Sequence, residues 1–174
     1  MRFRSSVTKA LAALVVFIPV LAAMSGASPT PKAAPHARRA GGHCTPVGGT
    51  IMTNLGAIDQ NTTMGTATGD LRGAVGAKIL NSDGVNFLIE HHWVTEAGDT
   101  IFFNPVTEVA TPLNPTNLQI FGLTLPHPIE VTGGTGRFDG ATGSIGAFGT
   151  LDFGHGETVF RYSGQVCFQE QNER

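Results

Sequence analysis

Basic residues are scarce beyond residue 42 of this 174-residue sequence. Residues 43–170 contain four lysines and arginines against twelve aspartates and glutamates, which gives a formal charge of −8. A domain this acidic repels nucleic acid and anionic lipid. We therefore expect neither of them as a partner.

Helix signals are equally scarce. Glycines and prolines, 23 and 10 in the whole chain, interrupt residues 43–170 so often that no 3.6-residue apolar period lasts three turns. Short runs of β-branched and aromatic residues between turn residues instead predict strands. Their spacing predicts an all-β barrel or sandwich. The expected strands are 49–53, 67–80, 85–94, 100–105, 117–123, 129–132, 137–153 (one bent strand or two) and 158–168.

Complete catalytic and cofactor motifs are missing. No serine lies in a nucleophile elbow, and no phosphate-binding Lys-Ser/Thr follows a glycine-rich segment. His91 and His92 are adjacent, so their side chains diverge on a strand, whereas a metal site needs ligands on the same face. We therefore expect neither a metal nor a cofactor.

The N-terminus has the pattern of a secretory signal over residues 1–27. Three basic residues precede the apolar run 10–23, and small residues follow at Ser25 and Ala27. The run is shorter than the ~20 apolar residues that a membrane span needs. We expect an extracellular protein whose mature form has no membrane contact.

Residues 28–42 are rich in proline and alanine and have almost nothing to bury, which predicts a disordered linker, or a propeptide processed at Arg38-Arg39. The folded domain then covers residues 43–170, and 171–174 form a tail. Cys44 and Cys167, the only cysteines, bracket this domain. In an exported chain they are expected to form a structural disulfide.

The last expected strand alternates cleanly. Thr158, Phe160 and Tyr162 fall on an apolar face, and Arg161 on the opposite, wetter one. An apolar inner face with a few polar groups suits a small-molecule cavity, although Tyr162 could instead be plain core. The residues that we predict to contact a ligand are Phe160, Tyr162, Phe102 and Arg161.

Candidate chemistry centres on the segment Glu90-His91-His92-Trp93. Glu90 and His92 share one strand face, so Glu90 could orient the imidazole of His92 for proton transfer inside a cavity. The alternative is that the pair forms an exposed polar face. Glu90 and His92 are the catalytic residues predicted from the sequence.

Two segments echo each other. Gly69-Asp-Leu-Arg-Gly-Ala-Val-Gly76 and Gly136-Arg-Phe-Asp-Gly-Ala-Thr-Gly143 share glycines around a central large apolar residue. Such glycines allow tight bends and close backbone approach. We interpret both segments as structural.

The segment Val131-Thr-Gly-Gly-Thr-Gly-Arg-Phe-Asp-Gly-Ala-Thr-Gly143 resembles a signature of the allene oxide cyclase and dirigent barrel superfamily. Segments 65–76 and 156–168 resemble secreted members of that group, so the likeness covers residues 47–168. It implies an eight-stranded antiparallel β-barrel, calycin-like, with a hydrophobic central cavity. It also implies homo-oligomers and, in members that are enzymes, cofactor-free cyclisation or coupling of apolar substrates. No catalytic residue transfers.

These features favour a secreted barrel that binds a small apolar molecule, either without catalysis or as a cofactor-free cyclase or isomerase. The alternative is a structural or interaction module whose barrel is filled with side chains.

Overall fold

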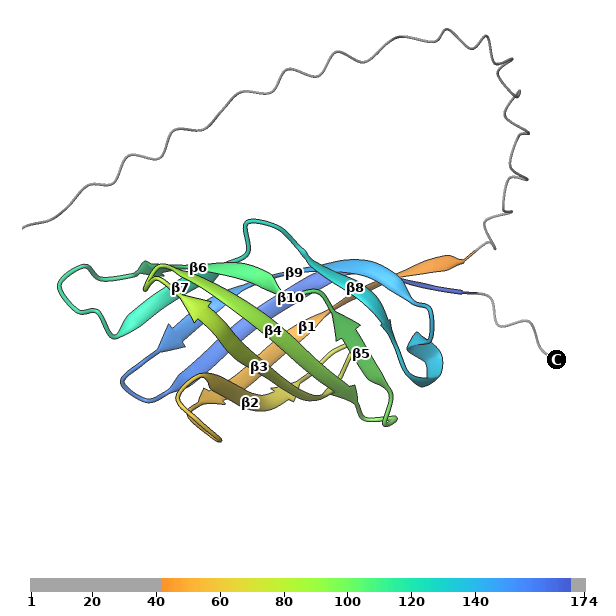
Figure 1. The fold of residues 1–174 in the computed structure, drawn as a ribbon, viewed down its shortest axis with the longest axis horizontal. Helices are drawn as coiled ribbons and strands as arrows, with labels where there is room; N and C mark the ends of the chain where they lie inside the picture. The colour runs from red at the N-terminus through yellow and green to blue at the C-terminus, as the bar shows by residue number, and fades with distance from the viewer. Residues whose placement is uncertain (1–41, 170–174) are drawn as a thin grey trace, which may run out of the picture. The chain divides into compact units, whose positions relative to one another are not determined.

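The computed structural model describes residues 42–169, which form an antiparallel β-barrel (Figure 1). The predicted signal sequence, the tail and all but the last residue of the linker lie outside the described residues. The elements in chain order are β1 (His43–Leu55), β2 (Thr62–Ala67), β3 (Gly73–Ser82), β4 (Asn86–Thr95), β5 (Thr100–Phe103), β6 (Val106–Pro112), β7 (Ile120–Thr124), β8 (Ile129–Gly134), the short 3-10 helix η1 (Gly136–Phe138), β9 (Thr142–Asp152) and β10 (Glu157–Phe168).

The sheet closes on itself through its last strand. β10 pairs with β1 on one side and with β9 on the other, and every pairing in the sheet is antiparallel. Closure removes the unpaired edges that an open sheet would present.

Ten strand segments make eight positions around the barrel, because two positions are each shared by two segments in series. β5 and β6 both pair with β4. Val94 of β4 lies opposite Thr100 of β5, and Ile89 of β4 lies opposite Val106 of β6. β8 and β7 both pair with β9 in the same way. Pro105 separates β5 from β6, and Pro126 and Pro128 separate β7 from β8. Proline has no N–H to continue a ladder. The eight-stranded antiparallel barrel is confirmed.

Some expected strand positions were wrong. β2 and β6 were not predicted: Gly65 breaks the apolar pattern of β2, and β6 follows Pro105 and ends at Pro112. The segment expected as one strand over 67–80 contains a turn at 68–72, and the segment expected from residue 137 begins in η1 rather than in a strand.

One end of the barrel is closed by side chains. Because neighbouring strands run in opposite directions, the connections β2–β3, β4–β5 and β8–β9 all lie at this end. Leu71 in the first connection and Phe138 in the last are 2% and 0% exposed. They are the central apolar residues of the two echoing segments. Gly69 and Gly136 begin these segments with φ of 88° and 56°, values that favour glycine.

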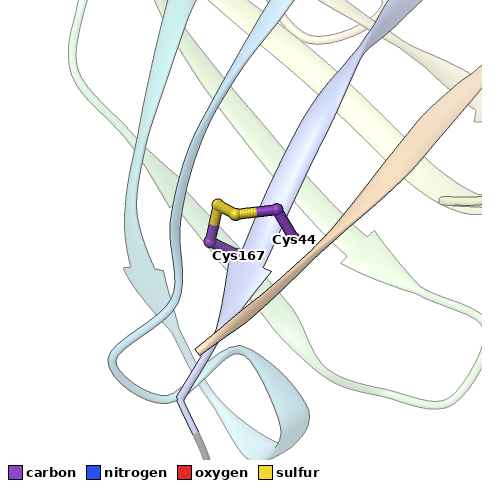
Figure 2. The surroundings of a disulfide bond; sticks show 2 residues. All are labelled: Cys44 and Cys167. Atoms are coloured by element: carbon purple, nitrogen blue, oxygen red, sulfur yellow. A yellow bond between two sulfur atoms is a disulfide. The ribbon is translucent and has the colours of Figure 1, made fainter. Parts of the chain in front are cut away.

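The predicted disulfide is present at the same end (Figure 2). Cys44 and Cys167 are directly opposite in the β1–β10 register, with Cα atoms 3.8 Å apart. Val166, the preceding residue on β10, is 0% exposed and points into the barrel, so Cys167 lies on the outer face. The bond therefore joins the first and last strands away from the interior.

Removing this bond should destabilise the barrel without changing its interior. The closed loop spans 123 residues, for which the chain-entropy relation gives roughly 5 kcal/mol. We expect the Cys44→Ser/Cys167→Ser double variant to lose about that much unfolding free energy in denaturant titration. A double variant as stable as the wild type would contradict the expectation.

Candidate functional site

A cavity lies inside the barrel between two apolar clusters. The first cluster, at the closed end, contains Leu71, Trp93, Phe138 and Val166, and the second contains Ala110, Leu123 and Leu151. About 90 Å³ between them is empty. Apolar side chains form most of its wall: Ile51, Leu55, Val75, Phe87, Ile89, Trp93, Phe103, Leu123, Ile145, Leu151 and Phe160.

Two polar pairs interrupt this apolar wall. On β4 and β6, His91 Nε2 lies 3.6 Å from Glu108 Oε1. On β1 and β10, the hydroxyl groups of Thr53 and Thr158 are hydrogen-bonded at 2.6 Å. All four residues line the cavity.

The two pairs face each other across the barrel. At the height of the two polar pairs, the strands around the barrel follow the order β10, β1, β2, β3, β4, β6, β7, β9. β6 is therefore opposite β1, and β4 is opposite β10. A bound molecule would meet an imidazole and a carboxylate on one wall and two hydroxyls on the other.

The polar atoms of the partly buried His91 and the buried Glu108 have few partners. Their side chains are 17% and 7% exposed. The separation of 3.6 Å is longer than a hydrogen bond, and His91 Nδ1 is buried with no hydrogen-bond partner. Buried polar atoms nearly always have partners, so an exception at a cavity wall makes His91 a candidate for contact with a ligand.

The side chains of the predicted catalytic pair, Glu90 and His92, lie on the outer side of the barrel wall. Glu90 and His92 do come together, with Oε2 and Nε2 3.8 Å apart, but their side chains are 44% and 63% exposed. Ile89 and Trp93 are buried, and alternation therefore turns His91 inward and its two neighbours outward. The expectation that the side chains of Glu90 and His92 point into a cavity was wrong, although His92 borders the cavity wall. Any catalytic role for them stays untested.

The predicted ligand contacts divide in the same way. Phe160 and Tyr162 line the cavity, as the alternation of β10 indicated. Phe102 is 50% exposed because Ile101 and Phe103 take the inward positions of β5. Arg161 is exposed between the inward-facing Phe160 and Tyr162. Phe102 and Arg161 are therefore corrected to the outer surface.

Tyr162 is held at the closed end of the cavity by the backbone of the β2–β3 connection. Its hydroxyl accepts from the Leu71 N–H at 3.1 Å and donates to the Thr68 carbonyl at 2.9 Å. Trp93 Nε1 donates to the Leu71 carbonyl at 2.6 Å, and the two rings pack edge to face. These bonds occupy the Tyr162 proton, so the residue positions the Leu71 turn.

Sequence reasoning missed Glu108 altogether. It lies in the unpredicted strand β6, where Glu108 and Ala110 point inward and Thr107 and Val109 alternate with them. A single carboxylate in a short strand between prolines resembles an ordinary surface residue. Only the β4–β6 pairing brings it beside His91.

No cluster of three or more histidine, cysteine, aspartate or glutamate side chains within residues 42–169 has the arrangement of a metal site. In the same part of the chain, no helix has the length and apolar character to cross a membrane.

Burial should be measurable in the titration of Tyr162, which is the chain's only tyrosine. Burial disfavours the phenolate and raises the pKa of Tyr162; the Leu71 N–H lowers it, and Asp70 raises it further. We expect the tyrosinate absorbance of the folded protein to appear above the ordinary value of about 10.

The raised pKa of Tyr162 also makes the stability of the fold depend on pH. The pKa of Tyr162 is higher in the folded state than in the unfolded chain. Its contribution to the free energy of unfolding is therefore complete below pH ~10 and is lost as the pH rises through the pKa of the folded state. Tyr162→Phe should abolish both the absorbance change and this part of the alkaline destabilisation. Titration at or below pH ~10 would contradict the burial argument.

No protein-family model and no curated protein matches the chain. Among solved structures, it is similar to a pterocarpan synthase dirigent protein, with 17% identity, a TM-score of 0.33, and coverage of 74% of this chain and 92% of that one. A likeness at this level says nothing about ligand or activity. The strand pairing itself establishes the barrel that the resemblance to the allene oxide cyclase and dirigent superfamily implied.

Proposed function

We propose that this protein is secreted and binds a small, largely apolar molecule in the central cavity of its barrel. The observation that carries the proposal is the empty apolar space that contains the polar groups of His91 and Glu108 on its wall. Apolar pockets with a few convergent polar groups are the usual form of small-molecule sites. The disulfide supports an oxidising compartment.

The cavity volume limits the ligand. About 90 Å³ is well below the ~300–1,000 Å³ of pockets for drug-sized molecules, and an apolar cavity of ~150 Å³ accommodates benzene. The free volume therefore suits a molecule of a few non-hydrogen atoms. The free space also favours binding over the alternative of a barrel filled by side chains.

Entry is proposed at the end away from the disulfide. The connections there, β1–β2, β3–β4, β6–β7 and β9–β10, have exposed apolar side chains instead of buried plugs. Examples are Ile58, Val85 and Leu118, which are exposed, whereas Leu71 and Phe138 fill the opposite end. Phe87 and Phe160, which are partly buried, lie on the cavity side of this end.

A role as a cofactor-free isomerase or cyclase is the finer proposal. It assigns proton transfer to His91 and Glu108, which face the cavity, in place of Glu90 and His92. Histidine is suited to this role because its charge changes near neutral pH, and Glu108 is close enough to orient it.

Filling the cavity should abolish binding. Trp93 is the chain's only tryptophan and lines the cavity, so its fluorescence reports occupancy. We expect a small apolar probe to change this fluorescence in the wild type. Ala147→Phe, a substitution on the inward face of β9, should remove the change.

Ala74→Phe is the matched control, because Ala74 is exposed on the outer face of β3 and its substitution should leave binding intact. Circular dichroism should verify the fold of both variants, since overpacking a core costs about 1–3 kcal/mol. A wild type that takes up no small apolar probe would contradict the proposal.

Catalysis, where a bound molecule is converted, should depend on the inward pair. We expect His91→Ala and Glu108→Gln to slow conversion by about 100-fold or more, the usual contribution of general acid–base catalysis. Glu90→Gln and His92→Ala should retain it. Product formation followed by NMR measures both, and loss of turnover in the outer variants alone would return the role to Glu90 and His92.

A further inference from the structure

Glu108 is the only charged residue among the buried residues of the described chain. Its side chain is 7% exposed, and it lies on the wall of an otherwise apolar cavity. A buried carboxylate is strongly disfavoured unless a cation or several hydrogen-bond donors compensate its charge.

The protein supplies little compensation. The ion-pair partner of Glu108 within residues 42–169 is His91, which is 3.6 Å away and charged only when it is protonated. The lysines and arginines of this part of the chain, Arg72, Lys78, Arg137 and Arg161, are all exposed. Arg72 and Arg137 are paired with Glu96 and Asp99. The cavity wall therefore has a carboxyl group without a fixed cation beside it.

The remainder of the wall suits a cation with a hydrocarbon body. Phe87, Trp93, Phe103 and Phe160 line the cavity together with Tyr162. Aromatic faces attract ammonium groups, and more strongly where water is excluded. The acidic barrel also raises the local concentration of cations relative to anions.

We propose that the ligand is a small aliphatic amine, bound as its ammonium ion with the charge between Glu108 and the neighbouring aromatic faces and the hydrocarbon part against the remaining apolar wall. This inference rests on the proposed function, because it names the chemical class of molecule for the same cavity. A neutral alcohol of the same shape could fill the space but would not neutralise Glu108.

The test compares isobutylamine with isobutanol, which have the same carbon skeleton and differ in the polar group. Binding is measured at neutral pH through Trp93 fluorescence and by calorimetry. We expect the amine to bind roughly tenfold tighter, since a charge-assisted hydrogen bond is about twice as strong as a neutral one. Glu108→Gln should remove the preference.

Glu157→Gln is the matched control. It makes the same chemical change at an exposed position on β10, so the preference should persist. If Glu108→Gln does not fold, Glu108→Met offers a neutral side chain of similar length, and the wild-type comparison is decisive in either case.

The outcomes separate the two proposals. Equal binding of amine and alcohol, tighter binding of the alcohol, or a preference that survives in Glu108→Gln would overturn the amine assignment while the binding function stands. If amine, alcohol and apolar probe all fail to bind, the binding function itself is wrong.

Discussion

β1 and β10 pair over nearly their whole length, from His43 opposite Phe168 to Asn54 opposite Glu157. This pairing converts a curved sheet into a closed barrel, and closure creates an inside. It also sets Thr53 beside Thr158 and Cys44 beside Cys167, so one register positions both an interior hydroxyl pair and an exterior disulfide. A shift of one residue would exchange the inward and outward faces of a strand. The cavity therefore depends on this register.

The two ends of the interior differ in how completely their polar groups are satisfied. At the closed end, the Leu71 turn fills the barrel and its backbone bonds with Tyr162 and Trp93. Further along the barrel, His91 Nδ1 has no partner, and Glu108 has only a distant one. Saturated polar groups stabilise a fold, whereas unsatisfied ones beside empty space are available to a ligand. This contrast distinguishes the structural tyrosine from the candidate site.

Prolines contribute to the site by interrupting the wall. The break at Pro105 divides one barrel position into β5 and β6, and β6 then presents Glu108 to the interior beside β4. A regular strand through this position would have been easier to predict from the sequence. The same break hid β6 from pattern analysis, because its seven residues include an acid and end at a proline.

The sequence by itself determined the all-β class, the disulfide and the alternation of β10, because local composition and a period of two carry that information. It also determined that His91 points away from Glu90 and His92. It could not determine which of those faces is inside, since both faces of β4 mix apolar and polar residues. Tertiary structure decided this by burying Ile89 and Trp93. It also brought His91 to Glu108 through a strand pairing that no local pattern specifies, because contacts between strands depend on the register of the closed sheet.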